Sequence, residues 1–161
     1  MIFITGGTGL VGSHILLKLS QDNIPFKSLK REESSLQICK EVFTHYNSSE
    51  LFDSINWVNG DINDIPSLEE GMQTCDKLIH AAAIVSFKKE DSELLQKVNV
   101  EGTENVMNVA LSSSIKKVAY ISSIATLGRT STSDIVNEDC MFQLSDKESN
   151  YAVSKYHAEQ E

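Results

Sequence analysis

The chain has 161 residues, 40% of them hydrophobic and 23% charged, and its 14 Lys and Arg against 23 Asp and Glu give a formal charge of -9. This length and composition fit one globular domain with a single buried core. The acidic balance argues against nucleic acid or an anionic membrane surface as the main partner, because both select for basic patches.

Short β-rich apolar runs alternate with helical patterns along the chain. In chain order we expect a strand at 2–5, a helix at 10–20, a strand at 26–30, a helix at 34–46, a strand at 55–58, a short helix at 64–72, a strand at 77–82, a long helix at 92–111, a strand at 117–122 and a helix from 151 onward. The inner side of the long helix should carry Leu94, Leu95, Val98, Val106 and Val109. Residues 129–150 are polar and lack periodicity, which in so long a loop indicates a lid or a mobile segment.

This alternation predicts an α/β fold of the Rossmann type, a doubly wound parallel sheet with helices on both faces. Such sheets bind ligands at the carboxyl ends of their strands, where the strand order reverses. The first strand normally borders that point. We therefore expect a ligand site at the end of the strand at 2–5.

Three cysteines, Cys39, Cys75 and Cys140, are spread along the chain without a CxxC pair or a Cys/His cluster. We expect free thiols in a reducing compartment, with neither a disulfide framework nor a metal site. No basic segment precedes an apolar run at the start, and no apolar run reaches the ~20 residues that span a bilayer. These features predict a cytoplasmic protein.

The segment TGGTGLVG, residues 5–12, lies between the first expected strand and the first expected helix. Glycine allows a tight turn at position 6, lets a phosphate approach the backbone at position 9, and lets the helix lie close to the sheet at position 12. The free N–H groups of the helix then bind a pyrophosphate. A plain turn is the alternative, and a P-loop is excluded because no Gly-Lys-Ser/Thr follows. The residues predicted to bind a dinucleotide here are Gly6, Thr8, Gly9, Leu10, Val11 and Gly12.

The GxxGxxG spacing of TGGTGLVGSH resembles the opening of the extended short-chain dehydrogenases/reductases, the NAD-dependent epimerase/dehydratase family. Five further segments resemble that family in the same order: GDI at 60–62, IHAAA at 79–83, NVEGTENV at 99–106, YISS at 120–123 and YAVSK at 151–155. Val85-Ser86-Phe87 is most similar to the dihydroflavonol-reductase and 3β-hydroxysteroid-dehydrogenase side of the family. Sugar-nucleotide epimerases and dehydratases are close relatives.

The resemblance implies catalytic roles for Ser123, Tyr151 and Lys155. Tyr151 and Lys155 are four apart and share one helix face, where an ammonium group favours the phenolate. Tyr151 would then exchange a proton with the substrate oxygen, and Ser123 would hydrogen-bond that oxygen. Among further implied cofactor contacts, Asp61 would meet the adenine amino group, Ser122 would act on the cofactor side or structurally, and Asn99 would lie near the ribose or an ordered water. The implied cofactor contacts outside the glycine segment are Asp61, Ile62, Ala81, Ala82, Ala83, Asn99, Ser122, Tyr151 and Lys155.

The second expected strand ends in Lys30-Arg31. An acidic residue there suits the ribose 2′-hydroxyl of NAD, whereas arginine suits the 2′-phosphate of NADP and can bind it through two nitrogens. We therefore expect NADP in preference to NAD. Glu32 and Glu33 follow directly, so solvated surface charges are the alternative interpretation.

These features predict an oxidoreductase that transfers hydride between a nicotinamide cofactor and a small-molecule secondary alcohol or carbonyl, similar to dihydroflavonol reductases. The alternatives are a nucleoside-diphosphate-sugar epimerase or dehydratase with bound NAD, and a non-catalytic dinucleotide sensor. Because members of this family are much longer, residues 1–161 are expected to form an incomplete NAD(P)-binding domain, without the substrate-binding part and with little turnover alone. The resemblance also implies a homodimer through the helices of Asn99 and Tyr151.

Overall fold

The computed structural model describes residues 1–128, 135–145 and 148–161. These residues form two compact units. We call Met1–Ala82 together with Asn105–Ile121 the sheet unit, and Ala83–Glu104 together with Ser122–Glu161 the helical unit.

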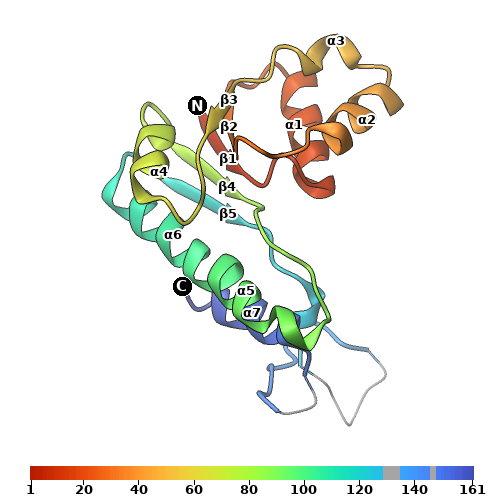
Figure 1. Cartoon of the computed structure of the whole chain (residues 1–161), viewed down its shortest axis with the longest axis vertical. Coiled ribbons are helices and arrows are strands. Elements are labelled where there is room, and N and C mark those ends of the chain that lie inside the picture. Colours follow the sequence, from red (N-terminus) through yellow and green to blue (C-terminus); the bar gives the residue numbers. More distant parts are fainter. Residues whose placement is uncertain (129–134, 146–147) are drawn as a thin grey trace. The chain divides into compact units, whose positions relative to one another are not determined.

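A parallel five-stranded sheet forms the centre of the sheet unit (Figure 1). Its strands are β1 (Ile2–Thr5), β2 (Phe26–Lys30), β3 (Trp57–Asn59), β4 (Lys77–His80) and β5 (Lys117–Tyr120), in the spatial order β3-β2-β1-β4-β5. Ile2 of β1 pairs with Phe26 on one side and with Lys77 on the other. The strand order therefore reverses at β1 and β4, and the predicted doubly wound sheet is confirmed.

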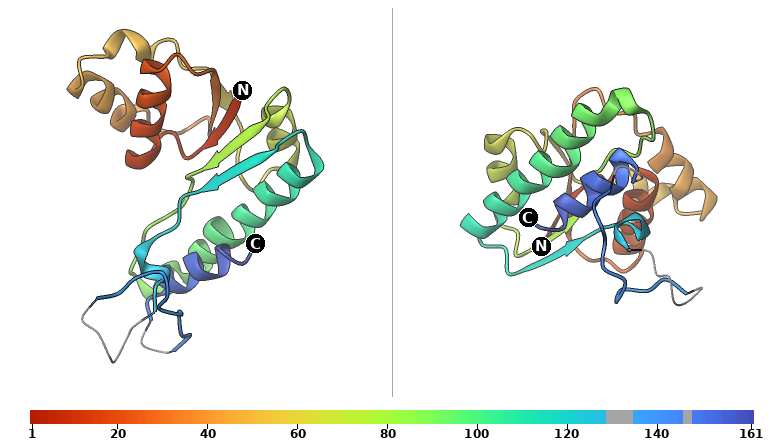
Figure 2. Two further views of the ribbon diagram at one scale, coloured as in Figure 1. Left: turned by 180° about the vertical axis from the view of Figure 1, so that it is seen from behind. Right: turned by 90° about the horizontal axis from the view of Figure 1, so that it is seen from below.

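Helices cover both faces of this sheet (Figure 2). They are α1 (Leu10–Gln21), α2 (Gln37–His45), α3 (Ser49–Phe52), α4 (Ile65–Met72) and most of α6 (Gly102–Ser112). Alternation along β1 sends Ile2 and Ile4 into a core shared with Leu16 of α1 and Phe43 of α2. Phe3 points to the other face, where a Cβ on Gly71 of α4 would lie 2.6 Å from the Phe3 ring. One strand of four residues thus anchors both layers of helices.

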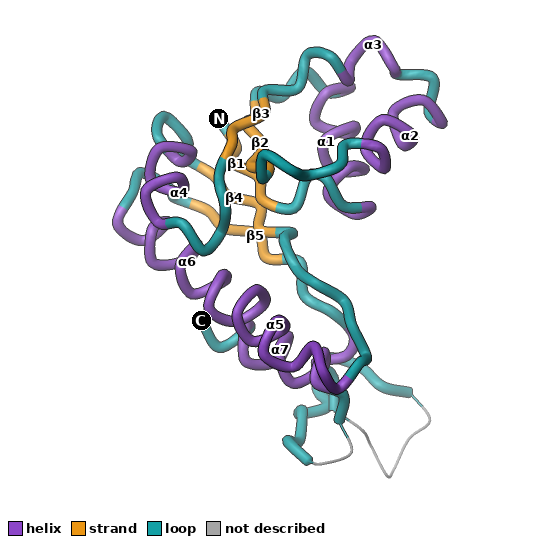
Figure 3. Tube along the Cα trace, in the orientation of Figure 1, coloured by secondary structure: helices purple, strands orange, loops and turns teal. Residues whose placement is uncertain are grey.

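Helices and loops make up the described residues of the helical unit (Figure 3). Its elements are the 3₁₀ turn η1 (Lys89–Asp91), α5 (Ser92–Leu95), the π-helix η2 (Gln96–Glu101), the 3₁₀ turn η3 (Ile124–Thr126), α7 (Asn150–Ala158) and the first residues of α6. Helix α7 packs against α5, η2 and η3. The unit therefore groups the segments that follow β4 and β5.

The long helix expected at 92–111 is confirmed, but the π-helical segment η2 interrupts it. A π-helical turn bonds residue i to i+5 and so changes which side chains share a face. Leu95, Val106 and Val109 are buried as predicted, whereas Leu94 is 45% exposed. The inward assignment of Leu94 was wrong, because Leu94 lies about 100° around the helix from the buried Leu95.

Smaller differences concern element ends. The third strand is Trp57–Asn59 instead of 55–58, and the second helix is shorter than 34–46. The four-residue helix α3 was not predicted, because one helical turn is too short to show a period. The lid or mobile segment expected at 129–150 includes residues 129–134 and 146–147, which lie outside the described residues.

Within the part of the chain that the structure describes, no helix has the length and apolar character needed to cross a membrane.

Candidate functional site

The turn after β1 brings two strand ends together. Gly6 has a φ of +76°, a conformation that L side chains rarely adopt. A Cβ on Gly6 would lie 2.5 Å from the carbonyl carbon of Ala81 and from the nitrogen of Ala82, so the two backbones touch. The tight turn predicted at Gly6 is confirmed. It brings the predicted cofactor residues Gly6, Ala81 and Ala82 to one place.

Gly12 is needed for a different contact from the one expected. A Cβ on Gly12 would lie 2.1 Å from the carbonyl oxygen of Gly6 and 2.8 Å from the Cα of Gly7. The close approach is therefore between α1 and the turn that ends β1. The expectation that Gly12 lets the helix approach the body of the sheet is corrected accordingly.

Gly9 differs from both, because a Cβ placed there would clash with none of the described residues. It is the N-cap residue of α1, with a φ of -86° that any residue can adopt. Among the described residues, the nearest non-adjacent atom to a Cβ placed there is the oxygen of Gly6, 3.5 Å away. The backbone at Gly9 is thus open to a ligand, and no neighbouring contact accounts for the missing side chain.

The first turn of α1 presents unpaired N–H groups next to this open position. The first helical hydrogen bond runs from the N–H of Ser13 to the oxygen of Gly9 at 2.8 Å, so the N–H groups of Leu10, Val11 and Gly12 have no partner within the helix. No side chain of the described residues caps this end, and the first turn of α1 contains no acidic residue. A phosphate group would complete this helix end.

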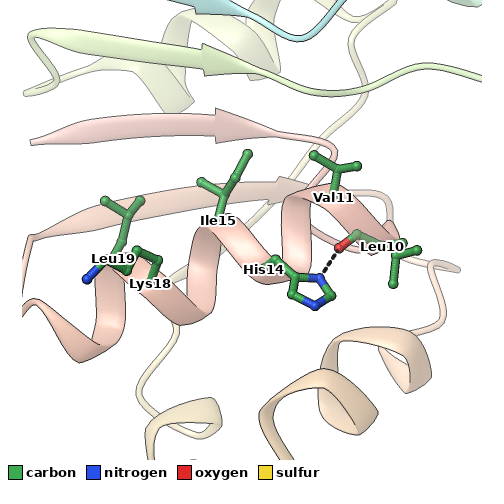
Figure 4. A pocket seen from close by; sticks show the side chains of 6 residues that line it. All are labelled: Leu10, Val11, His14, Ile15, Lys18 and Leu19. Carbon is green, nitrogen blue, oxygen red and sulfur yellow. Dashed lines mark hydrogen bonds between the residues drawn. The ribbon is translucent and has the colours of Figure 1, made fainter. Parts of the chain in front are cut away.

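The side of α1 that follows this turn forms an apolar groove (Figure 4). Val11, Ile15 and Leu19, spaced four apart, extend from one side of the helix, and Nδ1 of His14 donates to the backbone oxygen of Leu10 at 2.9 Å. Leu10 and Val11, both predicted cofactor residues, are 62% and 54% exposed at the start of the groove. The groove therefore begins at the proposed phosphate site.

The end of β4 is fixed by a buried polar contact. The hydroxyl of Thr5 lies 2.5 Å from Nδ1 of His80, and both side chains are fully buried. The same hydroxyl accepts the N–H of Ala82 at 3.3 Å, and the His80 ring stacks on Tyr120 of β5. These bonds fix the chain where the predicted cofactor contact of Ala81, Ala82 and Ala83 begins. Ala83 is exposed. His80 thus acts structurally.

The ends of β2 and β3 carry the residues expected to meet the adenosine half of a cofactor. Lys30 donates to the side-chain oxygen of Asn59 at 2.9 Å, and Nε of Arg31 lies 3.3 Å from Oε1 of Glu33 in an exposed ion pair. Oδ1 of Asp61 accepts the backbone N–H of Asn63 at 2.8 Å. These bonds order the ends of both strands.

The segment after β3 is tied to the start of α4. The backbone N–H of Asp61 donates to the hydroxyl oxygen of Ser67 at 3.1 Å. Ile62, the other residue predicted to contact cofactor here, is buried, and its carbonyl oxygen accepts the side chain of Asn105 at 3.3 Å. Ile62 can therefore offer a ligand little more than its backbone.

In the helical unit, the serine after β5 sits in a short turn. Ser123 is the N-cap residue of η3, and its Oγ accepts the N–H of Ala125 at 3.1 Å. Accepting this bond leaves the hydroxyl hydrogen of Ser123 available to donate. The neighbouring Ser122 instead donates its hydroxyl to Oε1 of Glu159. This contact supports the structural alternative for Ser122.

Helix α7 presents the Tyr-Lys pair on one face. Ser149 caps the helix by accepting the N–H of Ala152 at 3.1 Å. Tyr151 is half-buried, and the edge of its ring meets the exposed ring of Phe87, with centroids 5.7 Å apart. Lys155 is only 1% exposed. Burial lowers the pKa of Lys155 from 10.5 to about 8, and the negative charge of Glu159, one helical turn on, opposes this change.

Asn99 is used inside the protein. Its side chain accepts the N–H of Ile84 at 2.8 Å, donates to the carbonyl oxygen of Ile84 at 2.9 Å and donates to Oγ of Ser154 at 3.0 Å. With 1% exposure and both amide hydrogens engaged, this side chain holds α7 beside the loop after β4. Direct contact between the Asn99 amide and a ribose does not fit this arrangement.

Glu159 was missed by the sequence analysis. Its carboxylate accepts the hydroxyls of Ser122 and Thr126, the latter at 3.0 Å. The available signal was spacing, because Glu159 lies four residues after Lys155 and eight after Tyr151 and so falls on the same side of the helix.

A model of the 3-beta hydroxysteroid dehydrogenase/isomerase family matches residues 3–161 of the chain. The chain is 33% identical over 159 residues to a putative dihydroflavonol 4-reductase of Synechocystis, covering 99% of this chain and 43% of that protein. It is 30% identical over 162 residues to the 3 beta-hydroxysteroid dehydrogenase/Delta 5-->4-isomerase of Vaccinia virus, covering 98% of this chain and 44% of that protein. The chain thus spans less than half the length of these curated relatives.

Among solved structures, the fold is similar to that of UDP-glucose 4-epimerase from Thermus thermophilus, determined in complex with NAD. The TM-score is 0.79 at 22% identity, and the match covers 99% of this chain and 48% of that one. At this identity the likeness shows the fold, and it agrees with the parallel sheet described above.

Proposed function

The chain belongs to the 3-beta hydroxysteroid dehydrogenase/isomerase family, and from this premise we propose that its protein is an NAD(P)-dependent oxidoreductase that interconverts a small-molecule secondary alcohol and its carbonyl. The observation that carries the proposal is the helix α7, where the buried Lys155 follows the half-buried Tyr151 by one turn. In this proposal the sheet unit supplies the dinucleotide site and the helical unit supplies the groups that act on the substrate oxygen.

The residues at the start of α1 fit a dinucleotide. The open position at Gly9 provides room that a Cβ would reduce, and the N–H groups of Leu10, Val11 and Gly12 provide donors for a diphosphate. When bound, a nicotinamide dinucleotide supplies the hydride acceptor or donor for such a reaction. The names of relatives agree with this proposal, since several are reductases or dehydrogenases.

The acid–base groups follow from α7 and η3. The Tyr151 hydroxyl would give a proton to the carbonyl oxygen as the carbinol C–H bond forms, and would take it back in the reverse direction. Ser123, whose hydroxyl hydrogen is available, would donate to the same oxygen. The ammonium group of Lys155 would stabilise negative charge on the phenol oxygen. Water would restore the Tyr151 proton after each turnover.

We propose NADP as the preferred cofactor. The end of β2 carries the cations Lys30 and Arg31. Arg31 forms an exposed ion pair with Glu33, which contributes little free energy. Its guanidinium can therefore turn to a 2′-phosphate at low cost. We further propose that the protein acts in the cytoplasm, where its three free cysteines would stay reduced, and that it forms homodimers through the helices of Asn99 and Tyr151.

Isothermal titration calorimetry with NADPH and NADH tests the proposal on the purified protein, including any residues that follow Glu161 in the natural polypeptide. We expect NADPH to bind more tightly, and Arg31→Ala to weaken NADPH roughly 3–5-fold while NADH changes less than about 2-fold. The matched control is Lys116→Ala, because Lys116 is exposed at the amino end of β5, away from the carboxyl ends of the strands.

The outcomes separate the candidates. NAD that stays bound through purification would favour the epimerase or dehydratase alternative. Absence of binding by either dinucleotide would overturn the proposal for the sheet unit. If Arg31→Ala lost NADPH and NADH affinity equally, the preference for NADP would be overturned, but the proposal of a nicotinamide-dependent enzyme would stand.

A further inference from the structure

Glu159 lies at the C-terminal end of α7, on the side of the helix that carries Tyr151 and Lys155. Its backbone N–H donates to the oxygen of Lys155 at 3.1 Å, so it continues the helical hydrogen bonding. Its carboxylate accepts hydroxyl groups from outside the helix, from Ser122 and from Thr126. Two hydroxyl donors converging on one carboxylate oxygen form a specific junction between α7 and the segment after β5.

The two donors stand on either side of Ser123. Ser122 precedes it, and Thr126 closes the turn by sharing its hydroxyl hydrogen between the Ser123 carbonyl oxygen, at 2.8 Å, and Glu159, at 3.0 Å. The N–H of Thr126 also donates to the Ser123 carbonyl oxygen at 3.1 Å. Thr126 is 7% exposed, so its hydroxyl needs partners inside the protein. Glu159 therefore holds both ends of the turn in which Ser123 sits.

We propose that Glu159 is a positioning residue, which fixes the turn of Ser123 relative to the helix of Tyr151 and Lys155 by accepting the hydroxyls of Ser122 and Thr126. The inference rests on the proposed function, because it assumes that Ser123 and Tyr151 act on one substrate oxygen. Two groups that share a reacting atom must keep their separation, and a displacement of about 1 Å can lower the rate ~10²-fold.

The charge of Glu159 supports this role. A carboxylate binds hydroxyl donors more strongly than a neutral acceptor does. The same charge favours the ammonium form of Lys155, against the effect of burial. A neutral residue at this position would keep the fold of α7 but weaken both effects. The structure thus assigns Glu159 a role that helix formation alone does not require.

Steady-state kinetics of Glu159→Ala, Glu159→Gln and Thr126→Val test the proposal in the whole protein. We expect Glu159→Ala to lower kcat about 10–100-fold while KM for the cofactor changes less than roughly 3-fold, because the dinucleotide site is not altered. Glu159→Gln keeps an acceptor oxygen and should recover part of the loss. The control is Glu161→Gln, which neutralises an exposed carboxylate two residues further on and should match the parent protein.

A double-mutant cycle of Glu159→Ala with Thr126→Val adds a second measurement. If the two side chains act through their hydrogen bond, the double variant should lose clearly less than the product of the two single losses. Independent losses would indicate general destabilisation, and an unchanged kcat in Glu159→Ala would overturn the proposal. If Glu159→Ala does not fold, Glu159→Gln and Thr126→Val decide the outcome by the same criteria.

Amide hydrogen exchange separates this inference from the proposed function. If the parent protein has no oxidoreductase activity, the proposed function fails, and the junction is still tested at the amides of Ala125 and Thr126, both bonded to Ser123. We expect these amides to exchange at least about 10-fold faster in Glu159→Ala, because the turn opens more often without its tie. Unchanged exchange would overturn the positioning role on structural grounds alone.

Discussion

The two units differ in what they bury. The described core of the sheet unit contains large apolar side chains such as Phe3, Phe43 and Leu68. In the helical unit, the described buried apolar side chains are Leu95, Val100, Ala152 and Ala158, and the buried polar or charged ones are Asn99, Thr103, Thr126, Ser154 and Lys155. Apolar burial stabilises a fold roughly in proportion to area, whereas buried polar groups must find partners.

This difference separates stability from chemistry. The core stabilises the sheet unit, and this unit meets the proposed cofactor with backbone N–H groups, which every residue except proline carries. In the helical unit Asn99 donates to Ser154 and Glu159 accepts from Thr126, and these specific hydrogen bonds hold groups that are costly to bury. Substitutions in the core of the first unit should therefore change stability, those at its proposed cofactor site should change affinity, and those in the second unit should change turnover or relieve the cost of burial.

The largest expected effect is that of Tyr151→Phe. Removing the hydroxyl removes the proposed acid–base group and keeps the ring that meets Phe87. We expect kcat to fall ~10³-fold and the thermal midpoint to stay within about 2 °C. Steady-state kinetics and calorimetry measure the two quantities. Full activity in Tyr151→Phe would contradict the catalytic assignment, and would favour the dinucleotide sensor if cofactor still bound.

The next effect compares two glycines of the same corner. Gly6→Ala forces a side chain into the left-handed region and against the backbone of Ala81, so we expect a loss of roughly 3 kcal/mol or more in the free energy of unfolding. Gly9→Ala makes only an ordinary van der Waals contact with the oxygen of Gly6, so its stability should change by less than about 0.5 kcal/mol while its dinucleotide affinity falls roughly 10-fold. Urea unfolding and calorimetry measure both variants.

Two results would contradict this comparison. If Gly9→Ala destabilised the protein as much as Gly6→Ala, the corner would be structural throughout. If Gly9→Ala bound the dinucleotide as tightly as the parent protein, the phosphate would have to lie elsewhere.

Local patterns were enough to predict the sheet unit. Glycines between a strand and a helix at 5–12, and apolar runs bounded by turns, predicted the strands, the helices and the turn at Gly6, because these features depend on residues near one another in the chain. The parallel sheet followed from the alternation of strands and helices. The contact of Gly12 was placed less well, since it involves the backbone of Gly6 and not the sheet. The π-helical segment at 96–101 was not predicted either, since it has no local signature.

Long-range hydrogen bonds could not be predicted in the same way. Asn99 and Ser154 are 55 residues apart, and Ser122 and Glu159 are 37 apart, so their pairing depends on how helices pack. Resemblance identified Asn99 and Ser122 as site residues, with a ribose or an ordered water as the partner of Asn99 and a cofactor-side or structural role for Ser122. The structure shows internal bonds for both side chains. Glu159 belonged to no quoted motif, and only its spacing from Lys155 connected it to the site.

The smallest expected effect concerns the buried Lys155. Burial lowers its pKa from 10.5 to about 8, so below pH 8 the folded protein carries a buried charge that the unfolded chain exposes to water. Between pH 8 and 10.5 the folded state has released this proton and the unfolded state still holds it, so stability rises with pH across that window. At pH 7 we expect the free energy of unfolding of Lys155→Met to be about 1–3 kcal/mol larger than that of the parent protein.

That advantage of Lys155→Met should shrink as the pH rises from 8 to 10.5, because the parent protein then loses the buried charge while the variant has none to lose. Urea unfolding at several pH values measures the difference, and Lys97→Met, at an exposed position of η2, is the control with no such trend. Lys155→Met should lose activity although it is more stable. This is the compromise between stability and activity that is expected where a buried charge serves catalysis. A constant difference in free energy across this pH range would mean that Lys155 is not the group responsible, and that the helical unit does not hold this charge at a cost.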